Sequence, residues 1–173
     1  MNYFISDTHF GHKGSLIWNN GGIRPQFKDV TDMNNYMIEK WNSVVSDEDT
    51  VWFLGDFAYK CSIGFARGIF ESLNGSKHLI QGNHDYKIGI KLPWESISQI
   101  KQIEIMGKEI IMCHYPMLSW RHMMQGSIHL HGHTHGSIQD KNKGTNRIDM
   151  SVELYDYTPQ SETQIINESN TKV

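Results

Sequence analysis

The sequence predicts an α/β domain in which two sheets pack face to face. Three observations lead to this fold class. The first half of the chain alternates short apolar runs with amphipathic helical patterns, the second half is rich in hairpin signals, and polar residues follow most of the apolar runs. A chain of 173 residues can form one domain with a sizeable core, and no linker rich in Pro and Gly divides its halves. We therefore expect a single domain over residues 1–173, with a flexible tail after about residue 168.

The first half has the order strand, helix, strand, helix, strand. A loop rich in Gly and Asn over residues 10–30 leads into a first helix, for which Thr31 is the expected N-cap. A second helix around residues 66–73 is closed by Asn74 and Gly75. The three strands are expected at "NYFIS", "TVWFL" and "KHLI". This order is typical of a layered α/β domain with parallel strand pairing.

The second half is expected to contribute mainly strands. "QIEI" and "EIIMC" flank Met106, Gly107 and Lys108, a spacing that predicts a hairpin. "SIHL" and "RIDMSVEL" are two further strand candidates, since apolar and polar residues alternate in the second of them.

Composition excludes several classes of protein. The formal net charge of −3 argues against broad, charge-driven binding of nucleic acid. No apolar run approaches the roughly 20 residues that span a bilayer, and "MNYFISDTHF" does not have the pattern of a signal peptide. Cys61 and Cys113 are expected to be reduced thiols, which favours the cytoplasm. The oligomeric state is left open.

Polar side chains of the metal-binding type follow five of the predicted strands. They are Asp7, His9, Asp56, Asn83, His114, His133 and His135. Open α/β sheets bind ligands at the carboxyl ends of their strands, and in extended chain two residues separated by one position face the same way. Seven donors suit two ions that share a carboxylate better than one tetrahedral ion. Each motif alone has an ordinary explanation as a turn or a packed histidine, but their common placement favours a metal site.

These motifs resemble a known family. "DTH", "GD", "GNHD", "CHYP" and "GHTHG" are similar, in order, to the five-block signature of the calcineurin-like metallophosphoesterases, and "NRIDMSVELYDYTP" is similar to the closing strand of small bacterial and phage members. The resemblance implies a four-layer α/β/β/α sandwich, with two mixed sheets, flanking helices and a binuclear metal cleft at the strand ends. It implies two divalent metal ions as cofactors. Mn²⁺ is the first choice, and Fe, Zn, Ni or Co also accept these nitrogen and oxygen donors.

The resemblance also assigns roles to individual residues. The implied ligand sets are Asp7, His9 and His135 for the first metal, Asn83, His114 and His133 for the second, and Asp56 as the bridge between them. His84 matches the catalytic histidine of the family, and Asp85 matches the carboxylate that orients it.

Three further residues are candidates for gripping the substrate phosphate. Arg24, His12 and Arg121 lie on loops that should border the cleft, where a cation can bind a non-bridging oxygen. Arg24 is the strongest of them, because "RPQF" resembles a loop motif of small family members. A solvated surface charge is the alternative for each. His129 and His131 are assigned to the cleft edge or to strand packing.

The function that follows is a metal-dependent phosphodiesterase acting on a small or nucleotide-type phosphodiester. The expected reaction is attack of a metal-bridging hydroxide on phosphorus, with His84 protonating the leaving oxygen or stabilising charge. A short chain without a cap domain should leave the cleft open. A phosphomonoesterase or protein phosphatase-like enzyme is the nearest alternative, and a nuclease is disfavoured by the net charge. A non-catalytic scaffold is last, because all seven expected ligands are present.

Overall fold

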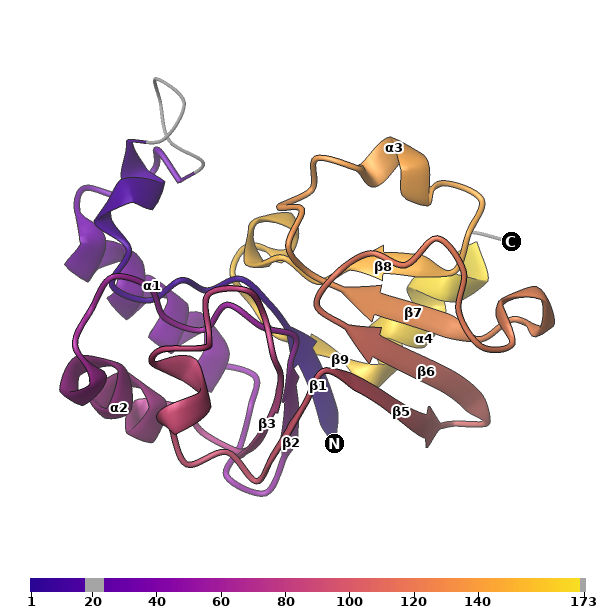
Figure 1. The fold of residues 1–173 in the computed structure, drawn as a ribbon, viewed down its shortest axis with the longest axis horizontal. Helices are drawn as coiled ribbons and strands as arrows, with labels where there is room; N and C mark the ends of the chain where they lie inside the picture. The colour runs from indigo at the N-terminus through magenta and orange to yellow at the C-terminus, as the bar shows by residue number, and fades with distance from the viewer. Residues whose placement is uncertain (18–23, 172–173) are drawn as a thin grey trace.

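Two sheets face one another in the computed structural model, which describes residues 1–17 and 24–171. The first sheet has the strand order β4-β3-β2-β1-β9, and the second has the order β5-β6-β7-β8 (Figure 1). The strands of the first sheet are β1 (Asn2–Ile5), β2 (Thr50–Phe53), β3 (Ser76–Ile80), β4 (Ser96–Ser98) and β9 (Gln160–Ser161). Those of the second are β5 (Ile100–Ile105), β6 (Lys108–Cys113), β7 (Ile128–His131) and β8 (Arg147–Asp149).

Both sheets are mixed, as predicted. Strands β1 to β4 are parallel and β9 pairs antiparallel with β1, whereas β6, β7 and β8 are parallel and β5 pairs antiparallel with β6. The two sheets also join directly, because a parallel bridge links Ser6, just after β1, to Ser151, just after β8. The carboxyl ends of the parallel strands of both sheets therefore meet at one edge of the molecule.

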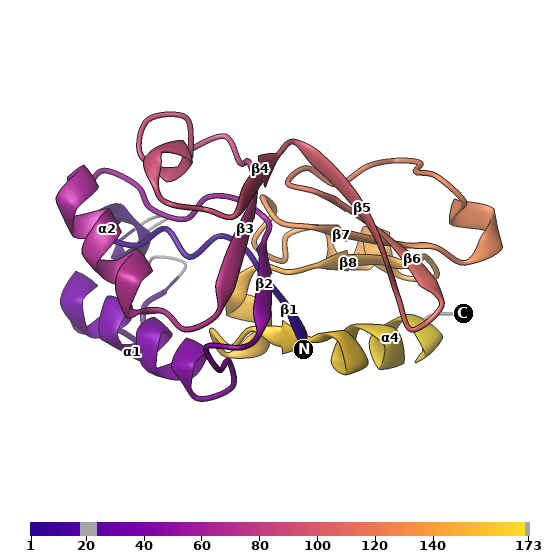
Figure 2. The ribbon, with the colours of Figure 1, turned by 90° about the horizontal axis from the view of Figure 1, so that it is seen from below.

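Two helices cover the outer face of the first sheet, on the side away from the second sheet (Figure 2). Helix α1 spans Val30–Asn42 and helix α2 spans Ile63–Ser72. The N-cap of α1 is Asp29, not Thr31 as predicted, because the Asp29 carboxylate accepts hydrogen bonds from the backbone N–H groups of Thr31 and Asp32. Trp41 is buried in the core between these helices and the sheet.

A second core lies between the two sheets. Its buried side chains include Phe4, Leu54 and Ile80 from the first sheet and its loops, and Ile110, Met112 and Leu130 from the second. Helix α4 (Glu162–Thr171) lies along this core and contributes Ile165, which is completely buried. The sequence analysis did not predict this helix, because its apolar positions are too few to give a clear helical period.

The C-terminal residues differ from the flexible tail expected after about residue 168. Helix α4 continues to Thr171, and Ser169 on its last turn is buried with its hydroxyl donating to the carbonyl of Ile166. Residues 172 and 173 lie outside the described part of the chain.

The outer face of the second sheet is covered by short elements. His129 and His131 of β7 point to this face and are fully buried, against Trp120 and Asn142 respectively. Their role is therefore strand packing, one of the two alternatives considered. The short elements here and elsewhere are α3 (Gln139–Asn142) and the 3-10 helices η1 (Lys13–Leu16), η3 (Gly89–Lys91), η4 (Met123–Gln125) and η5 (Val152–Tyr155). None of the helices in the described part of the chain is long and apolar enough to cross a membrane.

The strand predicted for "RIDMSVEL" is shorter than expected. Strand β8 ends at Asp149, because the Asp149 carboxylate accepts a hydrogen bond from the backbone N–H of Ser151 and turns the chain. Residues Val152–Tyr155 then form η5. The loop expected over residues 10–30 contains η1, and its residues 18–23 lie outside the described part of the chain.

Helix α4 should contribute measurably to stability. Ile165→Ala removes a completely buried side chain from the core between the sheets, so the free energy of unfolding should fall by about 2–5 kcal/mol. Ile100→Ala is the matched control, since Ile100 is 59% exposed. Urea unfolding monitored by circular dichroism gives both values, and equal losses would show that α4 does not pack as described.

Candidate metal centre

The seven predicted metal ligands lie at the edge where the carboxyl ends of the strands meet. Each follows the end of its strand by one to four residues, after β1, β2, β3, β6 and β7. Five of them form two clusters of ligand atoms that share Asp7, and in each cluster the atoms lie within 4.8 Å of one another.

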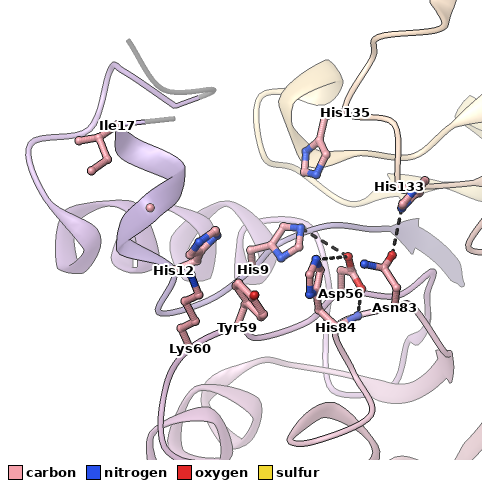
Figure 3. A pocket seen from close by; sticks show the side chains of 11 residues that line it. His9, His12, Ile17, Asp56, Tyr59, Lys60, Asn83, His84, His133 and His135 are labelled. Atoms are coloured by element: carbon pink, nitrogen blue, oxygen red, sulfur yellow. Dashed lines mark hydrogen bonds and ion pairs between the residues drawn. The ribbon is translucent and has the colours of Figure 1, made fainter. Parts of the chain in front are cut away.

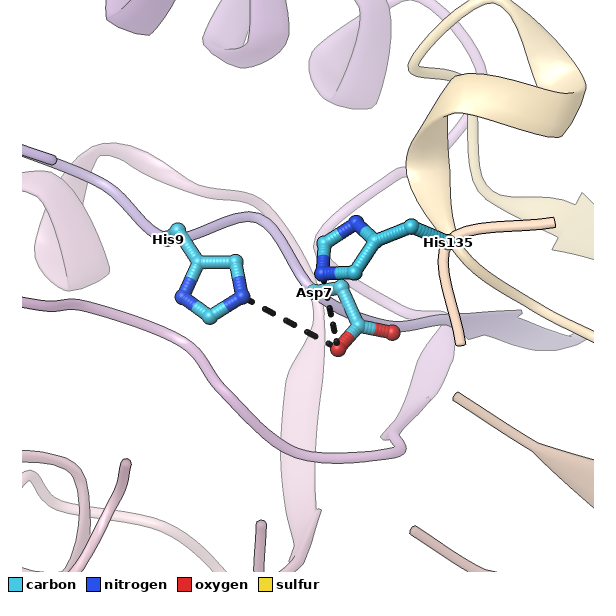
Figure 4. Close-up of side chains that lie close together, drawn as sticks. All are labelled: Asp7, His9 and His135. Carbon is cyan, nitrogen blue, oxygen red and sulfur yellow. Dashed lines mark ion pairs between the residues drawn. The ribbon is translucent and has the colours of Figure 1, made fainter. Parts of the chain in front are cut away.

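The first cluster contains Asp7, His9 and His135 (Figure 4). Both imidazoles point their Nε2 atoms at the Asp7 carboxylate, at 4.0 Å from His9 and 3.9 Å from His135 to Asp7 Oδ1. The two rings are stacked with their centroids 5.3 Å apart. Three atoms that could bind a metal thus lie close together, and they belong to the residues that the resemblance assigns to the first metal.

The second cluster contains Asp7, Asp56 and His114. His114 Nε2 lies 3.6 Å from Asp56 Oδ2, and His9 Nε2 lies at the same distance from that oxygen. Asp56 therefore reaches ligands of both clusters, which is the geometry that a bridging carboxylate requires.

Asn83 and His133 complete the second cluster. Asn83 Oδ1 lies 3.0 Å from His133 Nδ1 (Figure 3). The same oxygen lies 3.0 Å from His114 Nε2. His114 Nδ1 lies 2.7 Å from the carbonyl oxygen of Leu54, so its N–H donates there and its Nε2 carries a lone pair. The Nε2 lone pair and the Asn83 oxygen are both electron-pair donors and face one another, so neither can hydrogen-bond to the other. A cation bound by both would remove this repulsion.

The electrostatics of the site also fit divalent cations. Burial raises the pKa of Asp7 and raises that of Asp56 to about 7. Burial lowers the pKa of His9 well below its ordinary value, and of His133 to a smaller degree. A neutral imidazole has a nitrogen lone pair free for a metal. A buried carboxylate ionises when a nearby cation compensates its charge, so a bound metal would favour the ionised form. The donor set of nitrogen and oxygen atoms, without a thiolate, is that of a divalent metal site.

Several ligands have a strained backbone. Asp7, His9, Asp56, His133 and His135 all have positive φ angles, between 46° and 69°. Residues other than glycine adopt this region at a cost of about 1–3 kcal/mol each, and such residues concentrate at functional sites. Nothing in the spacing of the sequence shows this strain.

Neighbouring groups fix the orientation of Asp7. Its Oδ2 atom accepts hydrogen bonds from the Ser6 hydroxyl at 2.6 Å and from the backbone N–H of His133 at 2.9 Å. Gly132 packs so closely on this oxygen that a Cβ atom would overlap it. The position therefore requires glycine, and Asp7 Oδ1 is left to face the ligands.

Arg24 is not placed to bind substrate, in contrast to the prediction. It is completely buried, and its guanidinium donates to the carbonyl oxygens of Thr8 at 2.6 Å and Asp7 at 2.5 Å and to Glu153 Oε1 at 2.9 Å. A guanidinium presents several donors in a fixed geometry, and here two of them bind the backbone of Asp7 and Thr8. Arg24 thus fixes the loop that carries the ligands of the first cluster.

Glu153 is a residue of the site that the sequence analysis missed. Its Oε1 atom lies 3.0 Å from His135 Nδ1 and also accepts from Arg24, so it holds the imidazole with Nε2 towards the cluster. Burial acts to raise the pKa of Glu153, but Arg24 and His135 lower it to about 2. The sequence carries no signal for this contact, because the alternating pattern of "RIDMSVEL" predicts a strand and Glu153 lies in the 3-10 helix η5.

Asp85 also differs from its predicted role. The prediction placed this carboxylate beside the His84 ring, but it is completely buried and accepts hydrogen bonds from the backbone N–H groups of Asp56, Phe57 and Gly82. It therefore ties the loop after β2 to the loop after β3. Within the described residues, no hydrogen bond joins Asp85 to the His84 imidazole.

A cavity of about 800 Å³ opens over both clusters (Figure 3). His84 projects into it with its side chain 32% exposed and its Nε2 atom 3.9 Å from Asp56 Oδ2. His12 also lines this cavity, as predicted, and burial lowers its pKa to about 4. Arg121 does not line it, because its side chain is 62% exposed and pairs with Glu109. Tyr59 and Lys60 line the cavity and were missed by the sequence analysis, since they follow no recognisable motif.

Comparison with known proteins decides the family. The model of the calcineurin-like phosphoesterase superfamily domain matches residues 2–150. The chain belongs to this superfamily. Together with the clusters of His and Asp, membership makes it a metallophosphoesterase, a hydrolase of phosphoester bonds with a metal site. The two clusters are consistent with a binuclear divalent centre.

Individual relatives cover most of the chain. An uncharacterized protein of Methanocaldococcus jannaschii is 38% identical over 164 residues, which are 92% of this chain and 85% of that protein. The gene 66 protein of Mycobacterium phage L5 is 29% identical over 166 residues, 79% of this chain and 78% of that protein. The crystal structure of a protein of unknown function from Aquifex aeolicus has a TM-score of 0.74 and 28% identity, over 97% of this chain and 98% of that chain. Glu153 lies beyond the residues that match the family model.

Loss of the shared carboxylate should change metal stoichiometry. Protein saturated with Mn²⁺ and desalted should hold about two equivalents by elemental analysis, and Asp56→Asn should hold less than one, because Asp56 reaches both clusters. A metal concentration of 100 times the dissociation constant adds about 2.7 kcal/mol to the free energy of unfolding. The Tm of the wild type should therefore rise by roughly 5–10 °C. Asp47→Asn, at an exposed carboxylate, is the control. One equivalent, retained in Asp56→Asn, would contradict a binuclear centre.

Glu153→Gln should weaken both the fold and the first cluster. The substitution leaves the buried Arg24 charge without its counter-ion, so the free energy of unfolding should fall by about 3 kcal/mol. The His135 ring also loses its charged partner, so affinity for the first ion equivalent should fall about 10- to 100-fold in a titration calorimeter. Asp156→Asn, which breaks an exposed pair with Lys40, is the control and should change both quantities less. Unaltered metal affinity in Glu153→Gln would show that Glu153 only stabilises the fold.

Proposed function

We propose that this protein is a phosphodiesterase that hydrolyses a small or nucleotide-type phosphodiester. The observation that carries the proposal is the position of His84, a half-exposed imidazole in the cavity that belongs to neither cluster of ligand atoms. An unactivated diester loses an alkoxide, which needs a proton donor more than a good leaving group does. A proton donor beside the reacting phosphate is needed to cleave such a diester but is not needed merely to bind a phosphate.

The cofactors that we propose are two divalent ions, with Mn²⁺ as the first choice. Asp7, His9 and His135 would hold one ion, and Asn83, His114 and His133 the other, with Asp56 shared. When bound, such ions supply Lewis-acid activation of water and stabilise negative charge on a phosphoryl group.

The residues around the ions then have distinct duties. His84 donates to the leaving oxygen or to a non-bridging oxygen of the phosphate, from a backbone that is held by a hydrogen bond of 2.8 Å from its N–H to Asp56 Oδ1. Asp85 fixes the loops that carry Asp56 and Gly82, so it positions the site without touching the substrate. The Tyr59 ring, whose centroid lies 4.2 Å from that of His84, restricts the rotation of the imidazole.

Location and partners follow from the same features. Cys61 and Cys113 are free thiols, a form typical of a reducing compartment, so we propose that the enzyme acts in the cytosol. The net charge of −3 supports a small substrate over a long nucleic acid.

His84→Ala should discriminate between substrates. It should lower kcat for a dinucleotide such as thymidylyl-thymidine by about 10²–10⁴-fold, and that for bis(4-nitrophenyl) phosphate much less, because nitrophenolate leaves without a proton. Metal content should stay at the wild-type value, which elemental analysis checks. His122→Ala is the control, since His122 pairs with Glu109 and does not line the cavity.

Two results would overturn the proposal. Loss of a metal in His84→Ala would make His84 a ligand instead of a proton donor. A wild-type preference of tenfold or more in kcat/KM for 4-nitrophenyl phosphate over its diester, with every metal tested, would make the protein a phosphomonoesterase.

A further inference from the structure

The cavity extends beyond the metal centre, past His9 and His84. In Figure 3, His12, Tyr59 and Lys60 lie together on the side of the cavity opposite Asn83 and His133. None of these three belongs to a cluster of metal-ligand atoms. The mechanism proposed above uses the Tyr59 ring only as a support for His84, so the polar groups at this end have no assigned role.

The backbone holds this end of the cavity as firmly as it holds the metal ligands. The loop after β2 runs beside the loop after β1, with hydrogen bonds from Phe10 N–H to the Phe57 carbonyl at 2.9 Å and from Tyr59 N–H to the Phe10 carbonyl at 3.1 Å. Phe10 and Phe57 are completely buried. Because the same loops carry His9 and Asp56, the distance from Tyr59 and Lys60 to the metal centre is set by the fold.

The side chains form a connected row. The centroid of the Tyr59 ring lies 4.8 Å from that of His12 and 4.2 Å from that of His84, and Lys60 Nζ lies 5.2 Å from the Tyr59 centroid. A positive charge is thus held over an aromatic ring that contacts the catalytic imidazole. The Tyr59 hydroxyl makes no hydrogen bond to residues 1–17 or 24–171 and remains available as a donor.

Charge indicates what this row can bind. Among the described residues that line the cavity, Lys60 is the only Lys or Arg. The scissile phosphate would be neutralised by the metal centre, which leaves Lys60 for a second anion. An ammonium is an effective point-charge partner for a phosphate, and the phenol and imidazole beside it add neutral donors. A cavity of about 800 Å³ is large enough for a substrate with two such groups.

We propose that His12, Tyr59 and Lys60 form a subsite for a second phosphate, so that the preferred substrate is a phosphodiester one of whose alcohol arms carries its own phosphomonoester. This inference rests on the proposed phosphodiesterase function and names the substrate class for it. A substrate of this class is a 5′-phosphorylated nucleotide unit linked through its 3′-oxygen.

Two chromogenic substrates that differ by one phosphate test the subsite. Thymidine 3′-(4-nitrophenyl phosphate) with a 5′-phosphate should have a kcat/KM about 10- to 100-fold higher than the same ester without it. Lys60→Gln should reduce that ratio to near one, and Lys60→Arg should restore most of it. Raising the salt concentration should narrow the ratio for the wild type, because the exposed charge is screened.

Lys13→Gln is the matched control. Lys13 is exposed and adjacent to His12 in the sequence, but it does not line the cavity, so both kcat/KM values should stay at the wild-type level. Inhibition supplies a readout that is independent of turnover of these esters. Thymidine 3′,5′-bisphosphate should inhibit hydrolysis of bis(4-nitrophenyl) phosphate at a lower concentration than thymidine 3′-phosphate, and Lys60→Gln should remove the difference.

The outcomes separate the two proposals. If the wild type hydrolyses both thymidine esters at equal rates, or if Lys13→Gln lowers the ratio as much as Lys60→Gln, the second-phosphate subsite is overturned while the phosphodiesterase function stands. If the ratio is unchanged in Lys60→Gln, Lys60 does not bind the 5′-phosphate and the proposed subsite is overturned. If neither thymidine ester is hydrolysed but 4-nitrophenyl phosphate is, the proposed function itself fails.

Discussion

Two buried carboxylates in one cluster are the constraint on which the rest of this structure depends. Asp7 and Asp56 contribute ligand atoms that lie within 4.8 Å of each other and of His114, and burial raises the pKa of both. Like charges at this depth repel and lose hydration, so they are tolerated only where positive charge compensates them. The guanidinium of Arg24, which donates to the backbone carbonyl of Asp7, supplies one positive charge near the cluster, and divalent ions bound by the two clusters would supply the rest.

The fold meets the requirement by extending its strand pairing beyond the strands. Backbone hydrogen bonds continue from Asp7 to Gly55, from His9 to Asp56 and from Phe10 to Phe57, so the ligand loops are as fixed as the sheet beneath them. Asp85 then ties the loop after β2 to that after β3. The bridge between Ser6 and Ser151 ties the first sheet to the second. Positive φ angles at the ligands are held in place by this network.

Much of this arrangement could be predicted from the sequence, and the limits have physical reasons. The apolar runs predicted the strands. The motifs at the strand ends predicted that the ligands gather, because parallel strands bring their carboxyl ends to the same edge of a sheet. Arg24 was misplaced because a basic residue in a loop has the same sequence signature whether it faces solvent or the backbone. Glu153 was missed because its role depends on a contact with His135, which lies 18 residues away in the sequence. Lys60 was missed because its position beside the Tyr59 ring depends on the course of one loop. Helix α4 was missed because packing against two sheets, not local period, stabilises its short apolar face.

The bridge between the sheets has a consequence for how the centre forms. Ligands of the first cluster come from both sheets, and the backbone of His133 bonds to Asp7 across 126 residues of sequence. A partly folded chain in which only one sheet has formed therefore offers each ion three donors at most. The complete donor set of either cluster therefore exists only after the two sheets have docked, which couples metal binding at this centre to the long-range step of folding.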